Sequence, residues 1–262
     1  MQSIHLKPDD LDEQARAFRQ ARLERPLFLN SVPKSGSHLL RNIVRMFVPV
    51  EQQYSRDFIQ YGNLRDHLAA FDGPPAKLSW GHLFHSDISA ISTSAARKVL
   101  LVRDPYDWVL SKARFMLSDE FSGDLDMLKN GSISAEDLIS MVIFGIPRTL
   151  PALKETYTHN AVAWLGPEVH LVRYEELVSA VRNLEAPETK HYFSLLFDAC
   201  GIAMPADWCE RVRIGADPSR SGTAKQNLSG KTTTSLSDQL TEQQCAMVDF
   251  ASPGLRAILG YS

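Results

Sequence analysis

The feature that most constrains the fold is an apolar run that meets a glycine turn and then a helical pattern. PLFLNSV (26–32) has the length of a strand, and PKSGS (33–37) follows it directly. HLLRNIVRMF (38–47) then places its apolar residues on one helical face. Such a junction aims backbone N–H groups and the helix dipole at one point, which favours a phosphate there. The stretch predicts a phosphate-binding loop in an α/β fold.

The loop differs from the common P-loop. Lys34 precedes Gly36, whereas the usual lysine follows the second of two glycines. Lys34 adds a full positive charge, and Ser35, Ser37 and His38 add short donors. A plain strand–turn–helix junction with Ser37 as the N-cap explains the same residues. The loop by itself leaves both interpretations open.

A second candidate anion site follows the strand-like run KVLLV (98–102). Arg103 ends this run, and YDWVLSKARFML (106–117) reads as a helix with Asp104 as its N-cap. Ser111 lies about two turns into that helix, on the side of its start. We therefore expect Arg103 and Ser111 to reach one anion.

Strand-like runs alternate with helical patterns along the chain, and EVHLVRY (168–174) is a third such run. This order predicts βαβ units and a parallel sheet, whose ligands sit at the carboxyl ends of the strands. We expect a single-domain α/β fold of the P-loop type, with three layers and a central, mostly parallel sheet flanked by helices. Within it, 1–25 is expected as an extension with a surface helix over 8–22, and 118–150 and 213–237 as mobile loops.

Charge and composition limit the classes of partner that the protein is expected to bind. The net charge of −3 argues against general nucleic-acid binding. The sequence has no apolar run long enough to span a membrane and no secretory leader pattern. Its cysteines, Cys200, Cys209 and Cys245, have neither zinc nor disulfide-framework spacing. We expect a cytoplasmic protein that acts on a small molecule, without nucleic-acid or membrane partners, and that can form a homodimer.

Three segments together resemble one family. PKSGS and its helix look like the 5′-phosphosulfate loop of sulfotransferases, commonly P-K-S-G-T-T-W. VRDPYDWVLSKARF (102–115) looks like their 3′-phosphate motif, R-D/N-P-x-D-x-x-x-S, and LVRYEEL (171–177) resembles their R-Y-E-D/E-L segment. The motifs occur in the family's order, and the resemblance runs in patches over about 26–240. It implies 3′-phosphoadenosine 5′-phosphosulfate (PAPS) as the sulfuryl donor, 3′,5′-ADP (PAP) as the product, and no required metal.

Carried over by motif, the resemblance assigns donor contacts to particular residues. Arg103 and Ser111 would bind the 3′-phosphate, and Tyr174 would contact adenine. A strand-end tyrosine packed on the sheet is the alternative for Tyr174. The 5′-phosphosulfate would be bound by the residues of the loop: Lys34, Ser35, Gly36, Ser37 and His38.

A general base is needed to take the proton of the acceptor, and histidine suits neutral pH. His82 and His85 stand close together in SWGHLFHSD (79–87). The family's base sits on a G-H or T-H step before the 3′-phosphate arginine, so His82 is the first candidate and His85 the second. An ordinary loop histidine is the alternative for both.

By analogy with phosphoryl transfer, an in-line path through a loose transition state places negative charge on the bridging oxygen of the leaving nucleotide. In the family's pattern Lys34 neutralises that oxygen, which explains why the lysine precedes Gly36. We count His82, Lys34 and Ser111 as the candidate catalytic residues.

Two segments depart from the family. Trp80 stands where many members carry a lysine, two residues before the base. The C-terminal donor segment, often R-K-G-x-x-G-D-W, is eroded, and Lys225 falls on its arginine. Lys225 or Lys231 is expected to hold the 3′-phosphate from a mobile loop. A flexible polar surface loop is the alternative.

The sequence thus predicts sulfuryl transfer to a hydroxyl or amine of a small molecule. A P-loop nucleotide kinase or NTPase is the enzyme alternative, and a non-catalytic nucleotide-binding protein on the same fold is the other. The acceptor is not readable. Six aromatic residues are candidates for an apolar acceptor pocket, although helical spacing favours a core role: Tyr54, Phe58, Tyr61, Phe115, Phe121 and Phe144.

Overall fold

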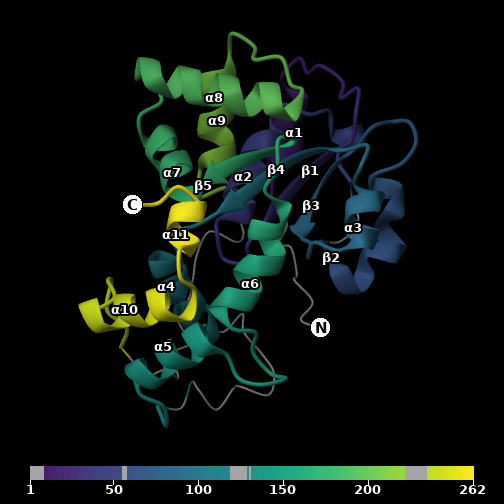
Figure 1. The fold of residues 1–262 in the computed structure, drawn as a ribbon. Helices are drawn as coiled ribbons and strands as arrows, with labels where there is room; N and C mark the ends of the chain where they lie inside the picture. Colours follow the sequence, from purple (N-terminus) through teal and green to yellow (C-terminus); the bar gives the residue numbers. More distant parts are fainter. Residues whose placement is uncertain (1–8, 55–57, 119–128, 130, 222–234) are drawn as a thin grey trace.

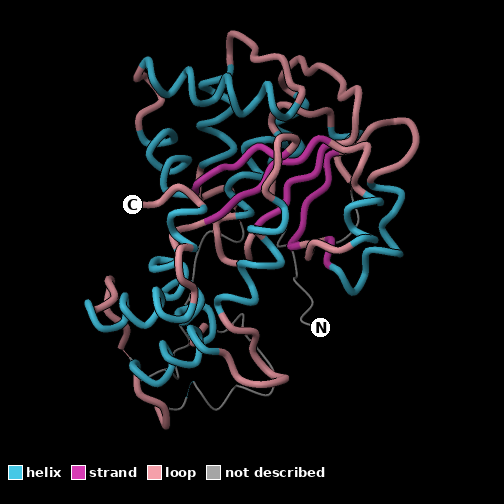
Figure 2. Tube along the Cα trace, viewed as in Figure 1, coloured by secondary structure: helices cyan, strands magenta, loops and turns pink. Residues whose placement is uncertain are grey.

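The computed structural model of the chain describes residues 9–54, 58–118, 129, 131–221 and 235–262. Five parallel strands form one sheet in the order β2-β3-β1-β4-β5, drawn in magenta in Figure 2. The predicted α/β class and parallel sheet are confirmed. The strands are β1 (Leu27–Ser31), β2 (Ile59–Gln60), β3 (Leu78–His82), β4 (Arg97–Val102) and β5 (Val169–Arg173).

Helices cover both faces of the sheet, which explains why every residue of its central strand is buried. In β1, Phe28 packs into the core on one face, while Leu27 and Leu29 pack into the core on the other. The helices are α1 (Leu11–Arg16), α2 (Ser37–Arg45), α3 (Asp87–Ser92), α4 (Pro105–Met116), α5 (Ala135–Phe144), α6 (Leu153–Asn160), α7 (Tyr174–Arg182), α8 (Pro187–Cys200), α9 (Trp208–Ala216), α10 (Glu242–Ala251) and α11 (Leu255–Ile258), with 3₁₀ turns at Val50–Gln52, Tyr61–Ala70 and Val162–Trp164.

Two helical layers result. Buried side chains of α1, α2, α7, α8 and α9 share a core with Leu29 and Val99, and those of α4, α5, α6 and α10 share one with Phe28 and Leu100. In Figure 1, α7, α8 and α9 lie at the top of the view and α4, α5 and α10 at the bottom. The three-layer arrangement is the one expected from the sequence.

The N-terminal helix is shorter than predicted. Instead of running over 8–22, α1 ends at Arg16, and Leu11 and Ala15 are buried against the body of the protein. The segment after Arg16 leaves the helix, and its polar groups form hydrogen bonds with other parts of the chain. The Arg19 carbonyl accepts a hydrogen bond from Arg211, and the Gln20 side chain donates to the Met46 carbonyl. The part of 1–25 that the structure describes is therefore packed on the core.

Two expected loops contain helices. Within 118–150, α5 begins after Ser134, whose side chain accepts from the Asp137 N–H, and it buries Leu138 and Val142. Within 213–237, the first residues still belong to α9, so that loop starts later than predicted. Parts of both segments are helical because they bury apolar side chains against neighbouring helices, whereas the polar residues around them favour loops. Residues 222–234 lie outside the described residues.

Among the described residues, no helix combines the length and apolar character that crossing a membrane requires.

Candidate functional site

The candidate residues gather where β1, β3 and β4 end. β1 is the central strand and pairs with β3 on one side and β4 on the other. The chain crosses from one side of β1 to the other after β3, so the carboxyl end of β1 is the switch point at which open α/β sheets bind ligands. The loop 33–37 leaves β1 there, His82 ends β3, and Arg103 follows β4.

The loop has an uncommon backbone. Both Lys34 and Gly36 have positive φ angles, 69° and 92°. Gly36 itself is the N-cap of α2, and no side chain caps the helix. The alternative in which Ser37 serves as the N-cap is therefore wrong, because Ser37 is the first helical residue. The N–H groups of the first turn are left facing the carboxyl edge of the sheet, as an anion site requires.

Hydrogen bonds to two neighbouring backbone groups, the Arg103 carbonyl and the Asp104 N–H, hold Arg103 in place. Its carbonyl accepts a hydrogen bond from the Tyr157 hydroxyl at 2.7 Å, and the Asp104 N–H donates to Glu175 at 3.0 Å. Its guanidinium lies 4.6 Å from the centre of the Tyr174 ring. That ring in turn packs on Gly36, so the arginine sits over the phosphate loop.

Two buried polar atoms of this region have no hydrogen-bond partner among the described residues, Ser35 Oγ and Arg103 Nε. A buried polar group without a partner is costly, and native proteins satisfy nearly all of them. Both atoms are hydrogen-bond donors that a phosphate oxygen would satisfy. The residues present therefore fit an anionic nucleotide at this place.

Ser111 lies beside the loop, and its reaching one anion together with Arg103 stays a prediction. It is buried in α4, and its hydroxyl donates to the Lys34 carbonyl at 3.3 Å. The Trp108 indole of the same helix donates to the Pro33 carbonyl. Ser111 is therefore held against the loop by the docking of α4.

The start of α4 is the one that the sequence predicted. The helix begins at Pro105, and Asp104 caps it by accepting from the Tyr106 N–H. Asp104 also forms an ion pair with Arg256 of α11. Its carboxylate thus has a structural role beside the site.

His82 is the last residue of β3, not a loop residue. Its Nδ1 lies 2.9 Å from the Ser31 carbonyl and 3.0 Å from the Ser31 hydroxyl. A carbonyl only accepts, so Nδ1 carries the ring hydrogen and Nε2 keeps the lone pair of the neutral ring. Burial, together with the charges of His38, Lys112 and Lys34, lowers the pKa of His82 to about 3. A neutral ring with its lone pair on Nε2 is the form that a general base requires.

Lys112 lies beside the candidate residues, and sequence reasoning did not single it out. Its Nζ lies 5.6 Å from the centre of the Phe115 ring, and Lys34 Nζ lies 4.2 Å from the same centre. Burial and the charge of Lys34 lower the pKa of Lys112 to about 8. The only signal was its place next to Ser111, inside the second motif. The two lysines concentrate positive charge beside His82.

The second histidine candidate, His85, is directed elsewhere. It is exposed, and its backbone N–H donates to the His159 carbonyl at 2.8 Å. Its ring packs on Trp164, with the two ring centres 5.0 Å apart. These contacts tie His85 to the region of α6 and hold it apart from the loop.

Of the two positions that depart from the sulfotransferase pattern, Trp80 is described by the structure and Lys225 is not. Trp80 is buried, with its ring centre 5.0 Å from that of His38. Burial and the charges of Arg41 and Lys34 lower the pKa of His38 to about 4. The predicted Lys225, and Lys231 with it, lie outside the described residues.

The aromatic residues proposed for an acceptor pocket divide into groups. Phe58 is buried with its ring centre 4.4 Å from that of His82, and Phe115 lies under the lysines. Tyr54 contacts His67 instead. Tyr61 and Phe144 are exposed, and Phe121 lies outside the described residues.

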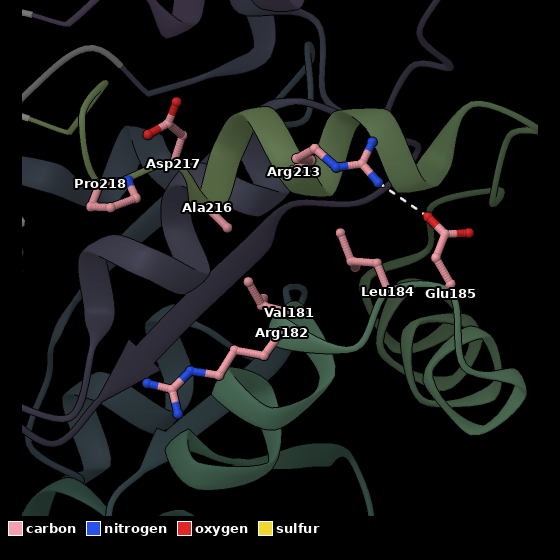
Figure 3. A pocket seen from close by; sticks show the side chains of 8 residues that line it. All are labelled: Val181, Arg182, Leu184, Glu185, Arg213, Ala216, Asp217 and Pro218. Carbon is pink, nitrogen blue, oxygen red and sulfur yellow. Dashed lines mark hydrogen bonds and ion pairs between the residues drawn. The ribbon is translucent and has the colours of Figure 1, made fainter.

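Within the part of the chain that the structure describes, no three His, Cys, Asp or Glu side chains are grouped so that they could hold a metal ion. A groove between α7 and α9 is separate from the candidate site (Figure 3). Its lining includes Arg182 and Arg213, the latter paired with Glu185, and none of the predicted site residues.

Comparisons with known proteins bear on the fold. No family model matches the chain, and no curated protein matches it. Among solved structures, the chain is similar to mouse sulfotransferase SULT7A1 complexed with PAP, with a TM-score of 0.60 and 14% sequence identity. The match covers 98% of this chain and 95% of that one. The chain has a sulfotransferase-like fold. At this identity the likeness is one of fold alone.

Proposed function

We propose that this protein transfers a sulfuryl group from PAPS to a hydroxyl or amine of a small-molecule acceptor. One observation supports the proposal: the 33–37 loop, Arg103 and His82 lie at the carboxyl edge of one parallel sheet, with Ser111 hydrogen-bonded to the loop. A phosphate loop with Arg103 and Ser111 beside it would suit a nucleotide that is phosphorylated at both its 5′ and 3′ positions.

The donor would be held by groups on both sides of the loop. The uncapped first turn of α2, the Ser35 hydroxyl and Lys34 face the 5′ end, and Arg103 with Ser111 faces the 3′-phosphate. Tyr174 lies between these two sites, on Gly36 and under the Arg103 guanidinium, where a nucleoside would pass. The bound nucleotide would satisfy Ser35 Oγ and Arg103 Nε.

The chemistry follows from His82 and the two lysines. Nε2 of His82 takes the proton of the acceptor as the new S–O or S–N bond forms, and the bond from sulfur to the phosphate oxygen breaks. Hydrogen bonding of Nδ1 to Ser31 keeps the ring in the tautomer that this step needs. Lys34 and Lys112 offset the negative charge that grows on the departing nucleotide.

The binding step is tested by thermal unfolding with PAP and, separately, with ATP and Mg²⁺. At PAP concentrations about 100 times Kd, the protein should gain about 2.7 kcal/mol of stability. Arg103→Ala should lose that gain, whereas Arg65→Ala, at an exposed arginine of the Tyr61–Ala70 turns, should keep it. Stabilisation by ATP and Mg²⁺ alone would instead support a nucleotide kinase or NTPase.

Cytoplasmic location and homodimer formation stay predictions, as does the expectation that neither nucleic acid nor membrane is a partner.

A further inference from the structure

Arg41 is a positive charge on α2 that the proposed reaction does not use. It lies one turn beyond the loop, half-buried, with its guanidinium 4.9 Å from the centre of the Trp80 ring. Among the described residues it has no carboxylate within ion-pairing distance. Burial, and after it the nearby charge of Arg45, lowers the pKa of Arg41 to about 10, against the opposing effect of Asp9 and Asp12.

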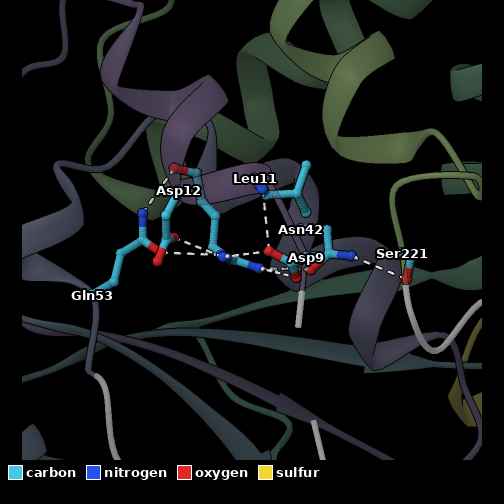
Figure 4. Close-up of polar contacts among 7 residues, drawn as sticks. Asp9, Leu11, Asp12, Asn42, Gln53 and Ser221 are labelled. Atoms are coloured by element: carbon cyan, nitrogen blue, oxygen red, sulfur yellow. Dashed lines mark hydrogen bonds and ion pairs between the residues drawn. The ribbon is translucent and has the colours of Figure 1, made fainter. Parts of the chain in front are cut away.

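The nearest carboxylates are already engaged. Figure 4 shows Asp9, Asp12, Asn42 and Gln53 grouped together. The side chain of each accepts a hydrogen bond from the Arg45 guanidinium. Asp9 accepts from Arg45 at 2.9 Å and Asp12 at 2.7 Å. Both carboxylates act on Arg41 only at longer range. Arg41 therefore keeps its fork of donors for another anion.

A short aromatic path joins Arg41 to the candidate base. The Trp80 ring lies 5.0 Å from Phe58, and Phe58 lies 4.4 Å from the His82 ring. Trp80 and His82 are two residues apart on β3, so their side chains leave the same face of the strand about 6–7 Å apart. Arg41 and His82 thus border one region, in which the Trp80 and Phe58 rings form a continuous row of contacts between them.

This region lies on the acceptor side of the loop. β3, which carries Trp80 and His82, pairs with one edge of β1, whereas Arg103 and Tyr174 follow β4 and β5 beyond its other edge. The 3′-phosphate site is therefore on the far side of the loop from Trp80. An anion beside Arg41 would belong to the molecule that receives the sulfuryl group.

We propose that Arg41 binds an anionic group of the acceptor, so that the protein selects hydroxyl compounds carrying a carboxylate, phosphate or sulfate about one ring length from the reacting hydroxyl. The inference rests on the proposed sulfuryl transfer, because that reaction makes this region the acceptor site. A guanidinium fork matches such oxyanions with two parallel hydrogen bonds. Phe58 and Trp80 supply the apolar surface for the ring between the two ends.

The test uses two matched phenols, 4-hydroxyphenylacetate and its neutral amide, 4-hydroxyphenylacetamide. Each is titrated calorimetrically into PAP-saturated protein. The wild type should bind the carboxylate about 10-fold more tightly or better, the worth of one charge-assisted hydrogen-bonded pair. Arg41→Gln should remove the preference and leave PAP affinity unchanged, while Arg41→Lys should retain part of it.

Arg182→Gln is the matched control, because Arg182 is exposed in the α7–α9 groove of Figure 3. It should keep the full preference. Equal binding of the two phenols, binding of neither, or a preference that survives in Arg41→Gln would overturn the proposal. So would a loss of PAP affinity in Arg41→Gln with the acceptor preference intact, which would assign Arg41 to the donor.

Failure of the proposed function gives a different result. In that case PAP does not stabilise the wild type, and the same titrations without PAP still report whether anion binding depends on Arg41. Unfolding midpoints of Arg41→Gln and Arg41→Lys show whether either variant has lost the fold, and Arg41→Lys keeps the test open if Arg41→Gln does not fold.

Discussion

The Tyr174 ring lies directly against Gly36, so that a Cβ added to Gly36 would meet Tyr174 Cδ2 at 2.4 Å. Gly36 also has a φ of 92°, which side chains rarely adopt. Gly36→Ala should therefore cost about 2–4 kcal/mol of stability and weaken PAP binding, from backbone strain and crowding together.

The matched control for this prediction is Gly166→Ala, because a Cβ at Gly166 meets nothing within 4 Å. Denaturant unfolding should show a change of less than about 1 kcal/mol there. Equal losses in the two variants would contradict the close contact between Gly36 and Tyr174.

Lys112 is expected to strengthen donor binding only while it is protonated. Because its pKa lies at about 8, PAP affinity of the wild type should fall as the pH rises from about 7 to about 9.5. Lys112→Met should bind PAP more weakly at neutral pH and show a flatter pH profile. Lys190→Met, at an exposed lysine of α8, should follow the wild type. Superimposable wild-type and Lys112→Met profiles would remove Lys112 from the site.

His82 is expected to make the fold sensitive to acid. Its folded pKa of about 3 lies below the ordinary value of 6.5. The unfolded chain therefore takes up a proton between these values that the folded protein does not. Stability is fully present above pH 6.5 and is lost as the pH falls toward 3. Relative to His82→Gln, the wild type should lose up to about 1.4 kcal/mol per pH unit in this window.

The check is a series of denaturant titrations between about pH 4.5 and 8, which spans most of that window. His85→Gln is the control, since His85 is an exposed residue. Wild-type and His82→Gln stabilities that change in parallel with pH would show that His82 is not held neutral.

Glu175 is expected to support the Arg103 backbone. It accepts hydrogen bonds from the Asp104 N–H and the Tyr261 hydroxyl. Glu175→Ala leaves both donors without a partner and should destabilise the protein by about 1–3 kcal/mol. PAP affinity should fall too, because the hydrogen bond from the Asp104 N–H to Glu175 no longer holds the backbone next to Arg103.

The adjacent Glu176→Ala is the control for Glu175. Glu176 is exposed and paired with Arg173, a surface contact worth about 0–1 kcal/mol. Unfolding curves and PAP titrations of both variants decide the point. A larger loss in Glu176→Ala than in Glu175→Ala would reverse the assignment.

Local sequence patterns predicted much of the fold. Strand, Pro-Lys-Ser-Gly-Ser turn and helix occur in the order predicted, and Pro105 begins α4 after the Asp104 cap. The strand β3 was not predicted, because a Gly-His step inside SWGH reads as a loop until its pairing with β1 is known. For α5, burial against neighbouring helices outweighed the polar residues around it.

The candidate site was predictable only where residues are close in sequence or share a motif. Ser111 contacts the Lys34 carbonyl because α4 docks on the loop, whereas the spacing after Arg103 predicted only that Ser111 and Arg103 share an anion. Lys112 and Arg41 gave no comparable signal. Their importance depends on which charges surround them, and Arg41 stands out only because Arg45 engages the nearest carboxylates.

The central claim is tested most directly by radiolabelled sulfuryl transfer from PAPS to a panel of phenols and amines, with wild type and His82→Ala compared at matched PAPS saturation. The account predicts transfer by the wild type and a loss of about 10²–10⁴-fold in His82→Ala, the usual contribution of a general base. Undiminished transfer by His82→Ala would contradict the role of the histidine. PAP binding by a wild type that transfers to none of the acceptors would contradict the proposed activity itself.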